Sequence, residues 1–146
     1  MSTEHFQKLE RMYLSANITR EFFETTTIQI SNKKAEIGLI ISESYYHALG
    51  AMHGAVYFKL LDDSAYFAAN SVEKGVFLLT SSFNINFLRP VNTGKITAIG
   101  KLKYAGREMY VAESALYDSK GKEIAFGIGN FAKSKVELTE EIGYGL

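Results

Sequence analysis

The sequence contains no cysteine, no tryptophan and a single proline among its 146 residues. Without cysteine the chain has no disulfide, no thiol nucleophile and no thiolate ligand for a metal. Its charge is balanced, with 16 basic and 16 acidic residues, so it lacks the overall field that holds a nucleic acid or an anionic membrane. We therefore expect neither of these partners, and any anionic ligand must be bound by local charges.

Long apolar runs are also missing. No run reaches the roughly 18 residues of a membrane span, and the polar N-terminus lacks the apolar core of a secretory signal, so a cytoplasmic protein is the simplest interpretation. The chain is nevertheless 47% hydrophobic and 13% aromatic, which is typical of a packed domain. At this length a single domain spanning residues 1–146 is expected.

The periodicity of the apolar residues predicts an α+β domain. Residues 4–15 have the spacing of a short amphipathic helix, and residues 25–41 have the pattern of a β-hairpin. The apolar stretch 49–71 predicts a long helix. Four antiparallel strands with short turns are expected to follow from residue 76.

Two features of this pattern bear on how the elements pack. A helix that is apolar on nearly all sides must be covered on nearly all sides, which predicts a curved sheet wrapped around it and favours a second subunit. In the last strand, Ala125, Gly127 and Gly129 leave one face nearly bare of side chains. Something can therefore pack closely against the sheet there.

Asp62 is a carboxylate inside the apolar helix. Burial without a partner disfavours the charged form and raises the pKa, which is how catalytic carboxylates usually arise. Ala55 and Phe58 share its face of the helix, which argues against full solvation. The alternative is a residue at a solvated edge, near Lys59 and Asp63.

The beginning of the same helix is the second candidate. Gly50 and Gly54 flank it, and the unpaired N–H groups and positive dipole of a helix start favour an oxyanion, such as the tetrahedral intermediate of acyl transfer. A tight turn or close packing explains the glycines equally well. His53 and His47 lie nearby, although a lone histidine is more often a structural hydrogen-bonding group than a catalyst.

The spacing of these candidates separates them within one chain. His53 and Asp62 are 62 − 53 = 9 positions apart, which in a helix is roughly 13.5 Å of rise and about 900° of rotation. They lie on opposite faces and cannot meet at one substrate atom. If both act on one bond, the His53-Gly54 end of one subunit must face Asp62 of another. The spacing thus predicts a homo-oligomer with active sites at the subunit interface.

The remaining polar candidates carry less information. Thr80 lies near the beginning of the strand after the helix, where a hydroxyl is often only a polar-face residue. The histidines are too scattered for a metal site, and GxSxG, P-loop, GxGxxG and HExxH motifs are absent, so we expect no metal and no cofactor. Basic residues on exposed strands usually form a solvated face. Those that could instead bind phosphates are Arg89, Lys101, Lys103 and Arg107.

From about residue 25 to residue 134 the chain resembles the hotdog-fold acyl-CoA thioesterases of the PaaI-like branch. This resemblance implies a curved antiparallel sheet around a long central helix, to which this chain adds an N-terminal helix. The residues that carry it are Leu49-Gly50-x-x-His53-Gly54, Asp62 nine residues past the histidine, Ala68-Ala69-Asn70-Ser71 and Phe87-Leu88-Arg89-Pro90.

The resemblance implies a role for each matched residue. Asp62 would be the nucleophile or general base that attacks the thioester or activates water at it. The backbone N–H of Gly54 would polarise the thioester carbonyl, with His53 shaping the turn, and Thr80 would help to position the attacking water. The family also implies an acyl-CoA substrate, with CoA present only as part of it, and sites shared between subunits of a dimer or a dimer of dimers.

Two residues depart from the family pattern. Ala55 stands where His-Gly is usually followed by a second glycine, which narrows the approach of the substrate. His47 stands six residues before the motif histidine, where relatives often have asparagine. Unlike asparagine, a histidine can titrate near neutral pH.

The leading hypothesis is therefore a homo-oligomeric thioesterase that hydrolyses an acyl-CoA. Two alternatives stay open. One is a non-catalytic acyl-CoA-binding sensor of the same fold, and the other is an enoyl-thioester hydratase or dehydratase in which a histidine and an acid act at one carbon. The acyl pocket is expected to be aromatic, lined by Tyr45, Tyr46, Tyr57, Phe58 and Tyr66.

Overall fold

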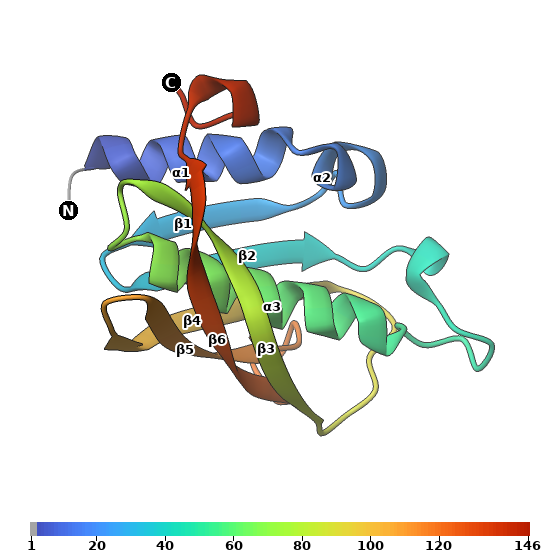
Figure 1. Cartoon of the computed structure of the whole chain (residues 1–146). Helices are drawn as coiled ribbons and strands as arrows, with labels where there is room; N and C mark the ends of the chain where they lie inside the picture. The colour runs from blue at the N-terminus through green and yellow to red at the C-terminus, as the bar shows by residue number, and fades with distance from the viewer. Residues whose placement is uncertain (1–2) are drawn as a thin grey trace.

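The computed structural model describes residues 3–146, in which the helices lie within or beside one curved sheet (Figure 1). The predicted N-terminal helix, hairpin, long helix and four following strands are confirmed, whereas α2 and two short 3-10 helices were not predicted. None of the helices in this described part of the chain is long and apolar enough to cross a bilayer. In chain order the elements are α1 (Thr3–Ser15), α2 (Asn17–Phe22), β1 (Thr27–Ser31), β2 (Lys34–Ile40), η1 (Glu43–Tyr45), α3 (Gly54–Asn70), β3 (Val76–Phe87), β4 (Lys95–Ala105), β5 (Met109–Tyr117), β6 (Glu123–Glu137) and η2 (Glu140–Ile142).

The central helix α3 begins at Gly54, later than the apolar stretch predicted. Gly50 has a φ of 80°, a left-handed conformation that glycine adopts without steric cost, and it reverses the chain. Tyr46 and Met52 pair across this reversal as an isolated antiparallel bridge. The residues before Gly54 therefore form a protruding turn, visible at the right of Figure 1, instead of a first helical turn.

The six strands form one antiparallel sheet in the order β1-β2-β4-β5-β6-β3. The sheet curls around α3, as predicted for an apolar helix, and α1 lies along β1 on the outside (Figure 1). β3 is the opposite edge and pairs only with β6 in the described chain. Leu79 and Phe87 on this edge strand are more than half exposed. The sheet thus has one edge flanked by α1 and one edge left open.

Gly100 on β4 allows α3 to approach the sheet closely. A Cβ atom placed at Gly100 would lie 2.0 Å from the carbonyl oxygen of Ser64 on the helix. On the adjacent strand β5, the hydroxyl of Ser114 donates a hydrogen bond of 2.8 Å to the carbonyl of Leu61. The missing side chain at Gly100 therefore sets the distance between helix and sheet.

The nearly bare face predicted for the last strand is filled by an aromatic ring from its neighbour. Cβ atoms added at Gly127 and Gly129 would lie 2.5 and 2.4 Å from ring atoms of Phe83 on β3. Phe126 and Ile128, which alternate with these glycines, face outward and are partly exposed. The close packing expected at β6 is confirmed, and the group that packs there is a cross-strand side chain.

Helix α1 and the C-terminal segment meet at the C-terminal end of α3. Met12 and Tyr13 on α1 are buried in the core. His5 lies 2.9 Å from the carbonyl oxygen of Asn70 through Nε2 and 2.6 Å from the hydroxyl of Tyr144 through Nδ1. Since a carbonyl only accepts, Nε2 is the donor, and in the neutral ring Nδ1 accepts from Tyr144. One imidazole thus joins α1, the C-terminal segment and α3.

We expect Gly100→Ala to lower the free energy of unfolding by about 3 kcal/mol, because the new methyl group collides with helix backbone that cannot move alone. Urea unfolding followed by circular dichroism measures the change. The control is Gly75→Ala, where the nearest atom is the flexible side chain of Glu73 at 3.2 Å, and the change should stay below about 1 kcal/mol. Equal effects of the two substitutions would contradict the close approach at Gly100.

Candidate active site

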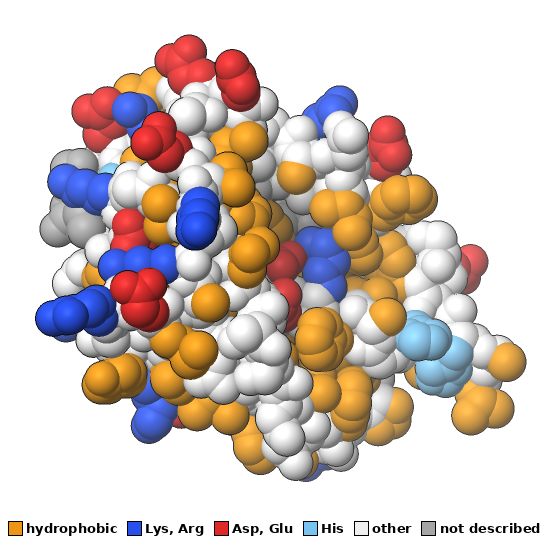
Figure 2. Space-filling model, viewed as in Figure 1, with side chains coloured by type: hydrophobic (Ala, Val, Ile, Leu, Met, Phe, Trp, Pro, Cys, Tyr) orange, Lys and Arg blue, Asp and Glu red, His pale blue; other side chains and the backbone are white. Residues whose placement is uncertain are grey.

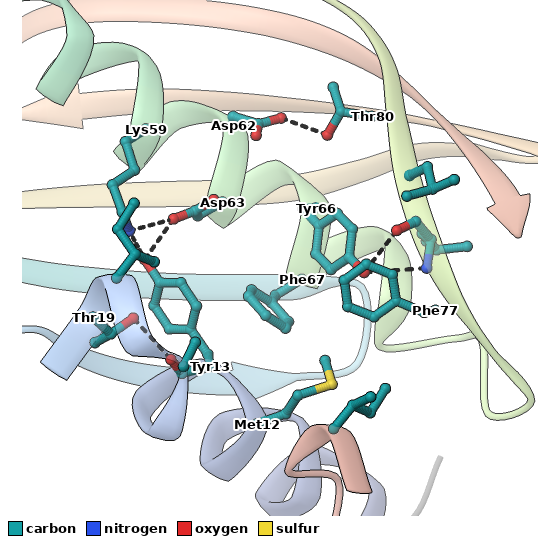
Figure 3. Close-up of a pocket in the computed structure, with 15 residues that line it drawn as sticks. Met12, Tyr13, Thr19, Lys59, Asp62, Asp63, Tyr66, Phe67, Phe77 and Thr80 are labelled. Carbon is teal, nitrogen blue, oxygen red and sulfur yellow. Dashed lines mark hydrogen bonds and ion pairs between the residues drawn. The ribbon is translucent and has the colours of Figure 1, made fainter. Parts of the chain in front are cut away.

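Asp62 lies beside a largely apolar cavity of about 450 Å³ between α1, α3 and β3 (Figure 3). The helix presents Asp62, Asp63 and Tyr66 to it, and β3 presents Thr80. The space-filling view shows acidic and basic side chains meeting in a hollow bordered by hydrophobic ones (Figure 2). This cavity is open to solvent on one side, so a small molecule can reach the carboxylate.

The Asp62 carboxylate is partly buried and has a single hydrogen bond in the described structure. Thr80 Oγ1 donates to Asp62 Oδ1 at 2.9 Å (Figure 3). The pKa of Asp62 is raised to about 6, chiefly by burial and to a lesser extent by the neighbouring charge of Asp63, while the Thr80 hydroxyl and Lys59 oppose the shift. The second oxygen of Asp62 has no partner in residues 3–146. The raised pKa agrees with the carboxylate expected in the apolar helix, and the structure brings Thr80, another candidate from the sequence, into contact with it.

The next residue, Asp63, is held in a different way. Its Oδ2 accepts hydrogen bonds of 2.7 Å from both the Tyr13 hydroxyl and Lys59 Nζ. Lys59 Nζ also lies 3.1 Å from the Tyr13 oxygen and 4.7 Å from the centre of the Phe23 ring. Asp63 is therefore a paired carboxylate, and its partner lysine is partly buried in the wall of the cavity. The i, i+4 spacing of Lys59 and Asp63 is a sequence signal for this pair, whereas the distant Tyr13 gave none.

The beginning of α3 lies at a second cavity of about 330 Å³. His53 caps the helix, because its Nδ1 accepts the N–H of Ala55 at 2.9 Å. The N–H of Gly54 has no acceptor within residues 3–146, as expected in a first helical turn. The residues that line this cavity are His47, Met52, Gly54, Tyr57, Phe87, Leu88, Arg89 and Pro90.

The two predicted histidines are close to each other but each has a local backbone role. His47 Nδ1 accepts the N–H of Leu49 at 3.1 Å, and the rings of His47 and His53 are 6.4 Å apart. Within residues 3–146, no three histidine, cysteine or acidic side chains gather as a metal site requires. His53 acts as a helix cap in this structure, while the imidazole of His47 borders the second cavity.

Gly54 and Asp62 do not share a cavity within one chain. They are 62 − 54 = 8 positions apart in continuous helix, about 12 Å along its axis. One cavity holds Asp62 and Thr80, and the other holds Gly54 and His47. The structure thus keeps apart the two groups that the sequence analysis expected to act together only across subunits.

The four basic residues predicted for phosphate binding are dispersed. Arg89 borders the cavity of Gly54. Lys101 borders a separate cavity formed by β4, β5 and β6, Lys103 lies 3.7 Å from Glu113, and Arg107 is exposed in the turn after β4. Among these four, only Arg89 is brought together with a predicted catalytic group.

The prediction of one aromatic acyl pocket needs correction. Of the five residues expected there, only Tyr66 lines the cavity of Asp62. Tyr57 lies at the other cavity, and Tyr45 donates a hydrogen bond to the carbonyl of Phe22. Residues near the helix in sequence face different sides of it, and the aromatic lining that was missed comes from elsewhere. It consists of Tyr13 on α1, Phe67 on α3 and Phe77 on β3.

We expect Asp62→Asn to stabilise the fold at about pH 8 and to have little effect near pH 4. The folded-state pKa lies above the unfolded one, so the fold binds the proton more tightly, and ionisation between about pH 4 and pH 6 lowers stability. Asparagine removes the free-energy cost of the buried charge and can still accept a hydrogen bond from the Thr80 hydroxyl. Urea unfolding at both pH values measures the change in the free energy of unfolding. Asp118→Asn is the control, because backbone N–H groups lower the pKa of Asp118, and it should give no gain at pH 8.

Comparison with known proteins places this geometry in a family. The family model of the thioesterase superfamily matches residues 49–125, which include Gly54, Asp62 and Thr80. A protein of Saccharolobus solfataricus named "Putative esterase SSO2140" is 26% identical over 123 residues, covering 84% of this chain and 88% of its own length.

Solved structures share the architecture. The PaaI protein from the phenylacetic acid degradation operon of E. coli superimposes with a TM-score of 0.84 at 21% identity, over 94% of this chain and 99% of its own. Thioesterase HI1161 of Haemophilus influenzae does so with a TM-score of 0.75 at 20% identity, over 87% and 88%. The sheet wrapped around a central helix is thus the hotdog fold, as the resemblance implied. With more than half of its residues matched by the family model, this chain belongs to the thioesterase superfamily.

Proposed function

We propose that the protein hydrolyses an acyl-CoA thioester to a carboxylic acid and free CoA. The observation that carries this proposal is the isolated, partly buried carboxylate of Asp62, which has a pKa raised to about 6 and a free oxygen facing an open cavity. At neutral pH it is ionised and still a useful base. The names of the relatives, a thioesterase and an esterase, agree with a hydrolase.

In the proposed reaction Asp62 acts as base or nucleophile at the thioester carbonyl. As a base, it takes a proton from water while the hydroxide oxygen forms the new bond to the carbonyl carbon. The tetrahedral intermediate then collapses, the C–S bond breaks, and the CoA sulfur leaves as a thiolate that takes up a proton. Thr80 fixes one carboxylate oxygen, so that the other is aimed at the water.

The oxyanion of that intermediate requires a donor, and Gly54 is the proposed one. Its N–H is free at the positive end of α3. Because Gly54 and Asp62 border different cavities, we propose that the Gly54 of one subunit faces the Asp62 of another. The open edge strand β3, with exposed Leu79 and Phe87, is the surface through which two copies would associate, as a dimer or within a dimer of dimers.

The CoA phosphates would then enter beside Arg89, the basic residue that borders the cavity of Gly54. Lys101, Lys103 and Arg107 stay candidates only for more distant parts of CoA, since they lie away from both cavities. His47 would contact the thioester end of CoA from the same side as Arg89.

We expect Asp62→Asn to reduce CoA thiol release from acyl-CoA substrates by at least about 100-fold, because asparagine neither takes a proton nor attacks. In the unmodified protein kcat should fall on the acid side with an apparent pKa near 6. A thiol-trapping assay between pH 5 and pH 8 measures both. Asp118→Asn, in the β5–β6 turn, is the matched control and should keep the activity.

The same assay separates this proposal from its alternatives. An unchanged rate of acyl-CoA hydrolysis in Asp62→Asn would contradict the assignment of Asp62 as base or nucleophile. Tight binding of acyl-CoA without thiol release would indicate a sensor, and loss of enoyl absorbance without thiol release would indicate a hydratase.

We expect Gly54→Pro to lower kcat by about 100-fold while the protein stays folded. Proline removes the N–H, is favoured in the first turn of a helix, and requires an extended residue before it. His53, the residue before it, already has this extended conformation, with φ of −63° and ψ of 143°, so proline at position 54 requires no change of the backbone there. Gly54→Ala keeps the donor, touches only the exposed ring of Phe87 at 3.2 Å, and should retain most of the activity.

Mixing the two inactive variants tests whether the site is shared. In a mixed dimer of Gly54→Pro and Asp62→Asn, one site carries both substitutions and the other carries neither. Refolding an equal mixture should therefore restore about a quarter of the unmodified activity. A mixture as inactive as its components would show that each site lies within one chain.

A further inference from the structure

The far wall of the Asp62 cavity comes from parts of the chain outside the family match. Residues 49–125 supply the side with Asp62 and Thr80. The opposite side is built by Met12 on α1, by residues of α2 and by Ile142 of η2. In Figure 3, Met12 lies at the end of the cavity away from the pair of Asp62 and Thr80. The size of this space thus depends on segments that lie outside the residues matched by the family model.

The lining of the cavity is unsuited to the CoA part of the substrate. Of the described residues that border it, Lys59 is the only basic one, and its ammonium is already paired with Asp63 at 2.7 Å. Two carboxylates, Asp62 and Asp63, border the same space. These carboxylates would repel a group with several phosphates. An apolar chain would instead be buried against the side chains of Met12, Phe67, Phe77 and Ile142.

From this lining we propose that the cavity is the acyl-binding site, that it accepts an acyl group with no charge at its far end, and that Met12 and Ile142 determine the acceptable chain length. This inference rests on the proposed function, which places the thioester carbon beside Asp62. It adds a substrate class, because a second carboxylate on the acyl group would enter a space bordered by Asp63, with no unpaired cation in the described lining.

The Tyr13–Lys59–Asp63 cluster is what excludes a charged acyl group. Tyr13 and Lys59 both donate to the same oxygen of Asp63, so the positive charge of Lys59 is compensated inside the wall. Removing the charge of Asp63 would leave the ammonium of Lys59 uncompensated beside the cavity. The exclusion should therefore weaken when Asp63 is neutralised.

The first experiment measures kcat/KM for straight-chain acyl-CoA substrates from butyryl to dodecanoyl. Ile142→Ala and Met12→Ala should each move the ratio of long to short substrates by about tenfold toward the long ones, because they lengthen the space. Ile142 is partly exposed on a short C-terminal turn, so its replacement keeps the test valid if Met12→Ala does not fold. Leu14→Ala, an exposed position on the same helix as Met12, is the control and should leave the ratio unchanged. An unchanged ratio in Ile142→Ala would overturn the chain-length assignment.

The second experiment compares hexanoyl-CoA with adipoyl-CoA, which differ by a terminal carboxylate. The unmodified protein should prefer hexanoyl-CoA by about 100-fold. Asp63→Asn should shift this preference by about tenfold toward adipoyl-CoA. The control Glu4→Gln removes the acidic partner of Lys8 in an exposed i, i+4 pair on α1 and should not shift it. Equal rates for both substrates in the unmodified protein, or no shift in Asp63→Asn, would overturn the charge assignment.

Failure of this inference is distinguishable from failure of the proposed function. If thiol is released but the variants leave selectivity unchanged, only the acyl site is wrong. If no acyl-CoA is hydrolysed, calorimetric binding of hexanoyl-CoA and adipoyl-CoA to the unmodified protein and to Ile142→Ala and Asp63→Asn measures the same preferences. Binding that responds to neither substitution would then overturn the acyl site as well.

Discussion

The close seating of α3 in the sheet is the constraint on which the rest of the structure depends. Because the helix is apolar on most sides, the strands curl around it, and Gly100 lets β4 come into backbone contact with Ser64. This enclosure partly withdraws Asp62 from water, and the hydrogen bond that it receives there comes from an uncharged group, the Thr80 hydroxyl. The same enclosure leaves the start of the helix, with the free N–H of Gly54, at a different opening.

Two consecutive carboxylates on this helix have opposite environments. Asp63 turns toward α1, where Tyr13 and Lys59 compensate its charge. Asp62 turns toward β3, and among residues 3–146 its one hydrogen bond comes from the hydroxyl of Thr80. A shift of about 100° per residue around a helix is enough to separate them. The paired aspartate forms part of the wall of a cavity, and the unpaired aspartate is the one assigned as base or nucleophile in the proposed reaction.

Much of the fold could be predicted from the sequence, because apolar periodicity is local. It identified α1, α3 and all six strands, and it marked Asp62 as a carboxylate inside an apolar helix. Thr80 was singled out only through the resemblance to a family. What it could not give depends on contacts between distant residues. The apolar residues after Leu49 resemble a helix, yet the left-handed Gly50 turns them outward. Tyr13 and Ile142 reach the cavity only because α1 and the C-terminal turn fold over it.

The hydrogen bonds of His5 to Tyr144 and to Asn70 bring the C-terminal segment back over the core. Ile142, which forms part of the cavity wall, lies two residues before Tyr144. A substitution of His5 would therefore loosen one wall of the cavity although His5 does not line it. The contact between the two terminal segments thus links the stability of the fold to the shape of the cavity.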